Sequence, residues 1–179
     1  GGWGYILGDE GSGYSIGLSG IKAAIRSAEN IREKTSLLSE CLNYFSINNI
    51  YDLIDLYYNQ TVSRKTTAAF AEKVFACAEK GDVAAKSIIT NEAEMLADTV
   101  LALLKDADKN IAIGLWGGIV QHNKVFCNIF NSYLVKKGFL NVKLIDFTPE
   151  VGAIFAGYRT ENIEISAAIK STVKNTYNT

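Results

Sequence analysis

An acidic pair, Asp9-Glu10, lies inside a glycine-rich run over residues 1–13 that also contains Trp3. Glycine is costly in a folded chain unless the backbone needs a positive φ or must approach something closely. Here the run brings main-chain amides, an indole ring and two carboxylates into one short segment. Amides and carboxylates bind hydroxyl groups and an aromatic ring can cover a sugar ring, so the run predicts a site for a polyhydroxylated ligand. The alternative is a glycine-rich hairpin that binds nothing.

The two carboxylates are expected to point in different directions. Neighbouring side chains of an extended stretch lie on opposite sides, so Asp9 can face a ligand while Glu10 turns toward the following segment. A role at the start of the next helix explains Glu10 equally well. Ser12 is most simply the N-cap of that helix, because a serine there accepts a hydrogen bond from the first turn.

A second candidate site is the pair Gly117-Gly118, which directly follows an apolar run over residues 111–116. A glycine pair after a strand lets a nucleotide approach the backbone. By itself the pair is equally typical of a plain tight turn. Gln121 and His122 begin the next predicted helix and could contact a base or a ribose. For His122, an exposed position without a chemical role is the simpler interpretation.

Hydrophobic periodicity predicts an α/β scaffold for these two sites. Residues 111–116 are expected to be a buried strand and residues 142–147 a second strand, joined by a helix in a βαβ unit with parallel strands and a right-handed crossover. Residues 3–7 are expected to form a short strand or hairpin arm. Helices are predicted over 12–28 and 36–45, from Asn49, from the polar break at 59–63 to Lys80, from the Asp82 cap to Leu104, from Val125 to Lys137, from Thr148, and within 161–174.

Composition restricts the classes of partner. The 179 residues fit one domain, and 18 basic against 19 acidic residues give no electrostatic reason to expect nucleic acid or an anionic membrane as a partner. No apolar run is long enough to span a bilayer. Cys41, Cys77 and Cys127 are scattered on apolar faces of predicted helices, which indicates reduced thiols in a cytoplasmic protein. With a single histidine, no metal site is predicted.

The glycine-rich run also resembles a known motif. Its order, Gly-Gly-Trp-Gly, three residues and then Gly-Asp-Glu-Gly-Ser, is similar to the sugar-site loop of N-acetylglucosamine kinases. These kinases belong with the BadF/BadG/BcrA-type ATPases in the actin, sugar kinase and Hsp70 superfamily. The resemblance implies a ribonuclease H-like (actin-like ATPase) domain with a mixed sheet and many helices. It also implies ATP and Mg²⁺ as cofactors and an amino sugar, such as N-acetylglucosamine or N-acetylmuramic acid, as substrate.

The resemblance assigns roles to eight residues. Sugar contacts fall on Gly2, Trp3, Gly4 and Asp9, and nucleotide contacts on Ala68, Gly117, Gly118 and Gln121. In this scheme Asp9 accepts hydrogen bonds from the sugar and orients it, and does not act as the base. Ala68 would border the adenine, although helix packing also explains a small residue there. Ser15 departs from the family pattern, which usually has Trp or Leu after the tyrosine, and this leaves the identity of the sugar open.

The superfamily also carries an amino-terminal domain with a phosphate loop and a catalytic aspartate, and neither motif occurs in residues 1–179. We therefore expect the carboxy-terminal domain of a two-domain kinase, inactive alone and able to associate, for example as a homodimer, through the face that the other domain would cover. One alternative is an activator of acyl-CoA dehydratases or reductases, in which cysteines bridge a [4Fe–4S] cluster. Another is a non-catalytic sugar-binding domain. The kinase interpretation requires Trp3 and Asp9 to face a shared hollow, in a segment that is not helical.

Overall fold

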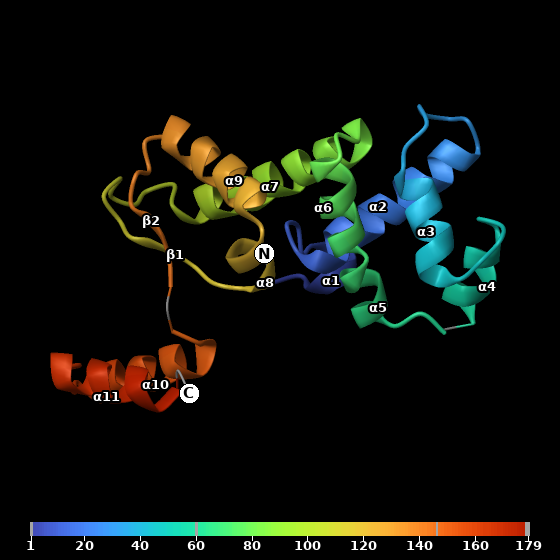
Figure 1. Cartoon of the computed structure of the whole chain (residues 1–179). Coiled ribbons are helices and arrows are strands. Elements are labelled where there is room, and N and C mark those ends of the chain that lie inside the picture. Colours follow the sequence, from blue (N-terminus) through green and yellow to red (C-terminus); the bar gives the residue numbers. More distant parts are fainter. Residues whose placement is uncertain (1, 60, 146, 178–179) are drawn as a thin grey trace.

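The structure, a computed structural model, describes residues 2–59, 61–145 and 147–177 and consists mainly of helices (Figure 1). The elements in chain order are α1 (Gly4–Leu7), α2 (Gly13–Ala28), α3 (Leu37–Phe45), α4 (Asp52–Tyr58), α5 (Arg64–Ala69), α6 (Ala71–Glu79), α7 (Val83–Leu103), β1 (Ile113–Leu115), α8 (Gly118–His122), α9 (Lys124–Lys136), β2 (Val142–Leu144), α10 (Pro149–Thr160) and α11 (Ala167–Tyr177). The predicted α/β class is confirmed. Gly1, Gln60 and Asp146, which belong to the glycine-rich run, the polar break and the second predicted strand, lie outside the described residues.

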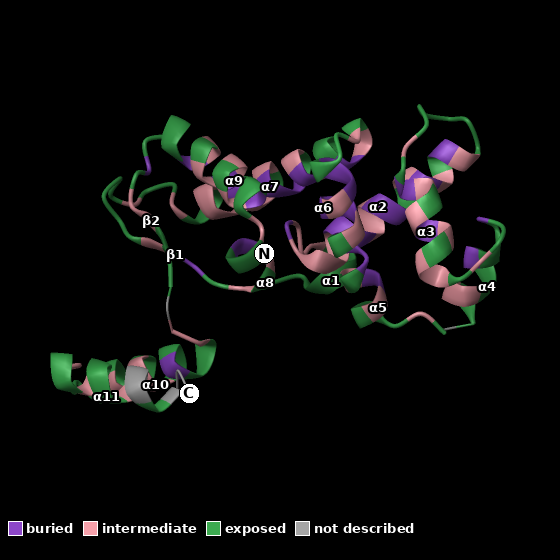
Figure 2. Cartoon of the chain, in the orientation of Figure 1, coloured by how far each residue is buried: buried purple, intermediate pink, exposed green. Residues whose placement is uncertain are grey.

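Helix α2 lies at the centre of the helical body and contacts α3, α5, α6 and α7. Its apolar residues recur at helical spacing, and Ile16, Ile21 and Ala24 are buried. Gly17 faces α5, where any side chain would collide with the Thr67 carbonyl. The missing side chain therefore lets α2 lie directly against the α5 backbone. Figure 2 shows that buried residues concentrate in α2, α6 and α7.

The helix starts predicted at Ser12 and Asp82 are confirmed. Ser12 Oγ accepts a hydrogen bond from the Ser15 amide at 3.1 Å, and Asp82 Oδ1 accepts one from the Ala85 amide at 2.9 Å. Helices α3, α9 and α10 also form where the sequence predicts them. The N-cap of α4 is Tyr51, two residues later than the expected cap Asn49. Helix α11 begins within its expected range but ends at Tyr177, beyond it.

The helix expected between the polar break and Lys80 is in fact two helices, α5 and α6, which meet at Phe70. Phe70 is completely buried, and its ring lies 5.3 Å from the Tyr44 ring and 6.1 Å from the Phe45 ring. At this junction the Phe70 amide donates to the carbonyl of Thr67, three residues back, which is a tighter turn than an α-helix makes. The aromatic contacts with α3 thus accompany a break that helical periodicity alone did not predict.

The strand or hairpin arm expected over residues 3–7 is wrong, because this segment forms the single helical turn α1. Gly2 and Gly4 have φ values of 85° and 75°, which a strand does not use. The turn places the Tyr5 ring edge-on against Tyr14 of α2, with ring centroids 5.0 Å apart. A tertiary contact with α2 therefore accompanies the helical conformation of this segment.

Strands β1 and β2 pair in parallel, as the βαβ pattern predicts, with Ile113 opposite Val142 and Leu115 opposite Leu144. Both strands are shorter than expected. The part of the chain that the structure describes has this one two-stranded sheet, so the expected mixed sheet is not found there. Helices α10 and α11 lie apart from the helical body, beyond the segment that follows β2 (Figure 1). Within the described ranges, no helix is both long enough and apolar enough to cross a bilayer.

Candidate functional site

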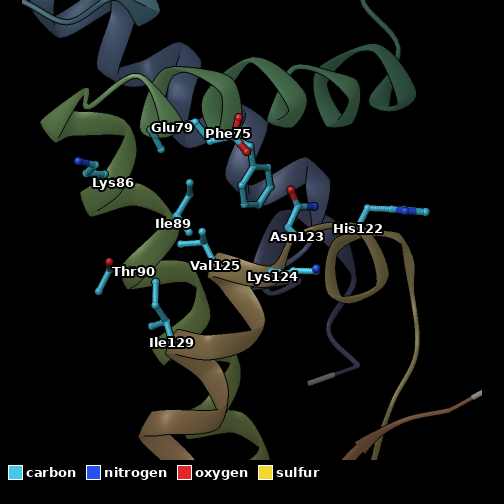
Figure 3. Close-up of a pocket in the computed structure, with 11 residues that line it drawn as sticks. Phe75, Glu79, Lys86, Ile89, Thr90, His122, Asn123, Lys124, Val125 and Ile129 are labelled. Carbon is cyan, nitrogen blue, oxygen red and sulfur yellow. The ribbon is translucent and has the colours of Figure 1, made fainter.

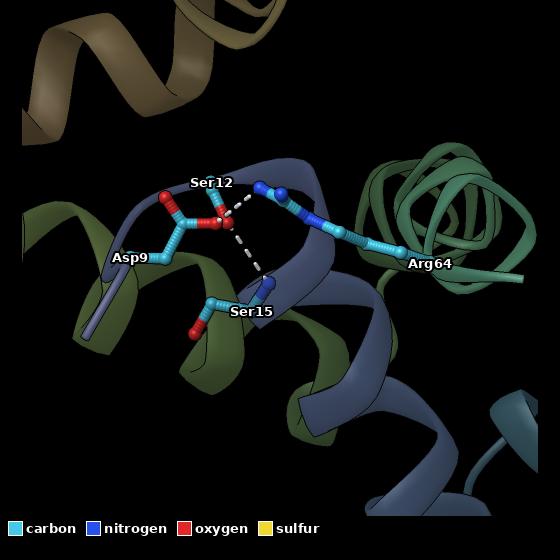
Figure 4. A network of polar contacts seen from close by, with 4 residues as sticks. All are labelled: Asp9, Ser12, Ser15 and Arg64. Atoms are coloured by element: carbon cyan, nitrogen blue, oxygen red, sulfur yellow. Dashed lines mark hydrogen bonds and ion pairs between the residues drawn. The ribbon is translucent and has the colours of Figure 1, made fainter. Parts of the chain in front are cut away.

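The turn that carries Asp9 is held from two sides, and the first contact comes from α5. Asp9 has a φ of 74°, a left-handed conformation that a non-glycine residue rarely adopts. Its Oδ2 atom lies 3.2 Å from Nη2 of Arg64, which reaches across from the start of α5 (Figure 4). The Arg64 guanidinium also lies 4.7 Å from the centre of the Tyr5 ring. The structure thus brings an acidic, a basic and an aromatic side chain together next to α2.

The second contact comes from Glu92, in the middle of α7. Its Oε2 atom accepts a hydrogen bond from the Gly11 amide at 2.9 Å. Its Oε1 atom accepts from the hydroxyls of Ser15 at 2.8 Å and Ser19 at 3.1 Å. Ser15, the residue that departs from the family pattern, therefore directs its hydroxyl toward α7.

Sequence reasoning missed both Glu92 and Arg64. For Glu92 a signal existed, because it lies three residues after buried Ile89 and four before Leu96, on the apolar stripe of α7. A charged residue in an apolar stripe needs a buried partner. For Arg64 the sequence offers no comparable signal, since its partner Asp9 is 55 residues away.

The other predicted sugar contacts are exposed. Trp3 keeps 73% of its surface accessible and caps α1, while Gly2 and Gly4 lie on either side of it in the exposed start of the chain. Trp3 and Asp9 belong to neither of the hollows described below. The structure therefore does not place the two residues in one described hollow.

Two of the four predicted nucleotide contacts line one hollow of about 650 Å³. Ala68 of α5 and Gly118 of α8 lie in its wall, together with Gly13 at the start of α2. A Cβ atom on Gly13 would lie 3.3 Å from the Ala68 carbonyl oxygen, whereas one on Gly118 would meet nothing within 4 Å. Packing thus explains Gly13, and the space beside Gly118 is open.

The other two predicted nucleotide contacts lie at the edge of this region. Gly117 precedes α8 with a φ of 132°, a conformation that favours glycine. Gln121 is exposed on α8 and is not part of the wall of the hollow, and its amide donates to the Gly117 carbonyl at 2.9 Å. His122 of the same helix does line the hollow.

An adjoining hollow of about 500 Å³ lies between α6, α7 and the start of α9 (Figure 3). Its apolar side is formed by Phe75, Ile89 and Val125, and Lys86 is among its polar residues. The two hollows have four residues in common, Phe75, Glu79, His122 and Asn123. They therefore form neighbouring parts of one recessed surface, which offers an apolar wall and a few polar groups.

The cysteines are poorly placed for metal or redox chemistry. Cys41 and Cys77 are buried, and burial raises the pKa of the Cys41 thiol to about 12. The Cys127 thiol donates to the Val120 carbonyl at 2.9 Å. Among the residues that the structure describes, no three histidine, cysteine or carboxylate side chains gather closely enough to hold a metal ion. We therefore assign no metal cluster of this kind within residues 2–59, 61–145 and 147–177.

A sequence profile of the BadF/BadG/BcrA/BcrD ATPase family matches residues 1–157. The chain belongs to this family. Its similarity to an N-acetylmuramic acid/N-acetylglucosamine kinase of Clostridium acetobutylicum is 34% identity over 137 residues, which is 75% of this chain and 45% of that protein. Its similarity to an N-acetyl-D-glucosamine kinase of Dictyostelium discoideum is 26% identity over 160 residues, which is 86% of this chain and 50% of that protein.

The fold is also similar to that of a solved structure. A chain from Chromobacterium violaceum, provisionally named an N-acetylglucosamine kinase, matches with a TM-score of 0.65 over 87% of this chain and 50% of that chain. At 19% identity this likeness concerns the fold alone. The chain spans about half the length of the curated relatives it matches.

The match to the BadF/BadG/BcrA/BcrD ATPases includes the helical turn α1. The expectation that this segment contains no helix is therefore wrong, in a chain that nevertheless belongs to the family. A helical turn of four residues, of which the first, Gly4, has a positive φ, is compatible with membership of the family. The contact of Asp9 with a sugar stays a prediction.

Proposed function

We propose that this chain is the carboxy-terminal half of an ATP-dependent amino-sugar kinase. The observation that carries the proposal is the N-terminus of α2, where the two candidate sites meet. Gly13, the first residue of α2, lines the hollow that also holds Ala68 and Gly118. The turn with Asp9 directly precedes Gly13, so a sugar bound at the turn and a nucleotide bound in the hollow would be neighbours.

On the sugar side, Asp9 would accept hydrogen bonds from hydroxyl groups and Trp3 would cover the ring, with Gly2 and Gly4 allowing close approach. The two curated relatives are named as kinases of N-acetylglucosamine, one of them also of N-acetylmuramic acid. We infer that this chain acts on the same class of N-acetylated amino sugar. The acceptor would be the primary hydroxyl at carbon 6. Asp9 would orient the sugar rather than remove its proton.

On the nucleotide side, the apolar wall of the recessed surface suits a flat base, and the open space beside Gly118 admits the ligand to the backbone. The phosphates would carry Mg²⁺, which proteins usually bind with few carboxylates and several phosphate or water oxygens. A phosphate loop and a catalytic aspartate would come from a preceding domain, so the chain alone would not transfer phosphate. In the complete enzyme the fold would be actin-like, with the present parallel strands part of a larger mixed sheet.

Burial of cysteine disfavours the main alternative. An acyl-CoA dehydratase or reductase activator needs thiolates near a subunit contact, but Cys41 and Cys77 are buried and the raised pKa keeps the Cys41 thiol protonated at neutral pH. If the complete protein binds both the sugar and the nucleotide but transfers no phosphate, the chain is instead a non-catalytic sugar-binding domain.

Calorimetry of the complete enzyme with N-acetylglucosamine and a non-hydrolysable ATP analogue tests the proposal. Gly118→Leu should weaken nucleotide binding by about tenfold or more, because the added side chain occupies open space that the ligand needs. Asp9→Ala should abolish sugar binding and leave nucleotide binding intact. Ala102→Leu, at an exposed position of α7, is the matched control. An unchanged nucleotide affinity in Gly118→Leu and an unchanged sugar affinity in Asp9→Ala would reject the two site assignments.

A further inference from the structure

Glu92 is the one carboxylate among the buried residues of the described chain, with only 5% of its surface accessible. A buried carboxylate is costly unless hydrogen bonds compensate for the water that it loses. The ion pairs of the described part join Asp9 with Arg64 and Glu40 with Lys73, so Glu92 is compensated by hydrogen bonds and not by a cation. The Glu92 carboxylate lies in an otherwise apolar stripe of α7, so its role depends on the groups that donate hydrogen bonds to it.

The three donors to Glu92 belong to the turn and to α2. The Gly11 amide, two residues after Asp9, donates to one carboxylate oxygen, while Ser15 and Ser19 of α2 donate to the other. The turn is also closed internally, since the Ser12 amide donates to the Asp9 carbonyl at 3.0 Å. A single side chain of α7 therefore fixes both the turn and the helix that follows it.

Contact with α7 is steric as well as polar. A Cβ atom on Gly11 would lie 2.9 Å from Cβ of Leu96, one helical turn after Glu92. Asp9 has a φ of 74°, which is strained for a non-glycine residue, and Gly11 has a φ of 78°, which glycine adopts freely. Strained backbone persists only where the surroundings hold it. Glu92 and Leu96 together provide that support.

We propose that Glu92 is a positioning residue for the sugar site: its hydrogen bond to Gly11 sets the turn that presents the Asp9 carboxylate. The proposal rests on the proposed function, because it takes the turn to contact an amino sugar. The role requires acceptor atoms at the end of the side chain. A glutamine can still accept from the Gly11 amide and donate to the two serine hydroxyls, which accept as well as donate. A leucine of similar size leaves the Gly11 amide without its partner.

The test separates the hydrogen bond from the function. Hydrogen exchange of the Gly11 amide, measured by NMR on the chain, should be slow in the native protein and in Glu92→Gln, and fast in Glu92→Leu. In the complete enzyme, Glu92→Leu should raise the KM for N-acetylglucosamine by about tenfold or more and leave the KM for ATP unchanged. Glu92→Gln should restore a sugar KM close to that of the native enzyme. Glu94→Leu, on the same helix, is the control for loss of a carboxylate.

Several outcomes would overturn the proposal. Gly11 exchange that is unchanged in Glu92→Leu would show that the hydrogen bond does not hold the turn. Equal rises in both KM values would indicate general weakening of the fold. Fast Gly11 exchange with an unchanged sugar KM would refute the positioning role, and it would remove this turn from the sugar site while the nucleotide site stayed intact. If Glu92→Leu does not fold, Glu92→Asp, which keeps the charge but shortens the reach, should show the same selective rise in sugar KM.

Discussion

Arg64 and Asp9 form a contact in which the cation is the more exposed partner, with 58% of the Arg64 side chain and 31% of the Asp9 side chain accessible. Exposed ion pairs contribute little to stability, typically below about 1 kcal/mol. The effect of Arg64 should therefore appear in ligand binding, because its guanidinium restricts where the Asp9 carboxylate can point. The Tyr5 ring beneath it restricts the guanidinium in turn.

On the proposed kinase function, we predict that Arg64→Ala raises the KM for the amino sugar by about three- to tenfold and changes the melting temperature by less than about 3 °C, in line with the small stability of exposed pairs. Steady-state kinetics of the complete enzyme and thermal unfolding measure the two effects. Lys65→Ala removes an adjacent exposed cation and is the control. A large loss of melting temperature without a change in KM would contradict the prediction.

At the scale of elements, Asp82 joins the starts of two helices. Its Oδ1 atom caps α7, and its Oδ2 atom accepts from the Thr35 hydroxyl at 2.8 Å and from the Ser36 amide at 2.7 Å, just before α3. Burial alone would raise the pKa of Asp82, but these hydrogen bonds hold it below the ordinary value. The side chain thus ties the start of α7 to the start of α3.

The lowered pKa of Asp82 gives a pH-dependent prediction. The ionised carboxylate stabilises the fold fully above its unfolded-state pKa of about 4, and this contribution is lost as the pH falls through the lower folded-state value. Asp82→Asn places an amide opposite the Ser36 amide and should lower the free energy of unfolding at neutral pH by about 1–3 kcal/mol. Below about pH 4 the difference from the native protein should shrink. Urea unfolding from pH 7 to pH 3 measures it, with Asp106→Asn as an exposed control; a constant difference over this range would contradict the prediction.

Some helices could be predicted from the sequence and others could not. Helices α2 and α7 have a clear apolar period and a capping residue, and both formed as expected. The break at Phe70 and the turn α1 both coincide with ring contacts to other elements, which local periodicity does not reveal. In the candidate site, Ala68 and Gly118 line one hollow, and their contact with a nucleotide stays a prediction. The Glu92 contact with Gly11 spans 81 residues and could be inferred only as an unsatisfied charge.

At the scale of the whole molecule, the sheet is small and its strand edges are open in the described residues. In the described residues β1 and β2 pair only with each other, and a two-stranded sheet is marginally stable in water. Leu144 and Ile145 at the end of β2 keep 54% and 40% of their surface accessible, and Trp116 after β1 keeps 45%. Unpaired strand edges beside apolar side chains are typical sites of association.

We therefore predict that the chain self-associates as its concentration rises. Light scattering coupled to size-exclusion chromatography should give a mass that increases with concentration, and Leu144→Lys should reduce the increase, since a charged residue at an exposed edge opposes pairing. Leu103→Lys, on the exposed end of α7, is the control for loss of an exposed leucine. A constant monomer mass would contradict this prediction and the homodimer expected from the sequence.

The outer edges of the parallel pair β1 and β2 determine what kind of backbone can pair with them. The outer N–H and C=O groups of a strand at a sheet edge bond in register with another extended backbone, at a spacing of about 4.8 Å. Otherwise water or side chains satisfy them. A strand that adds to this rim, for instance from a second copy of the chain, would therefore gain a row of backbone hydrogen bonds that a helix laid along the rim does not provide.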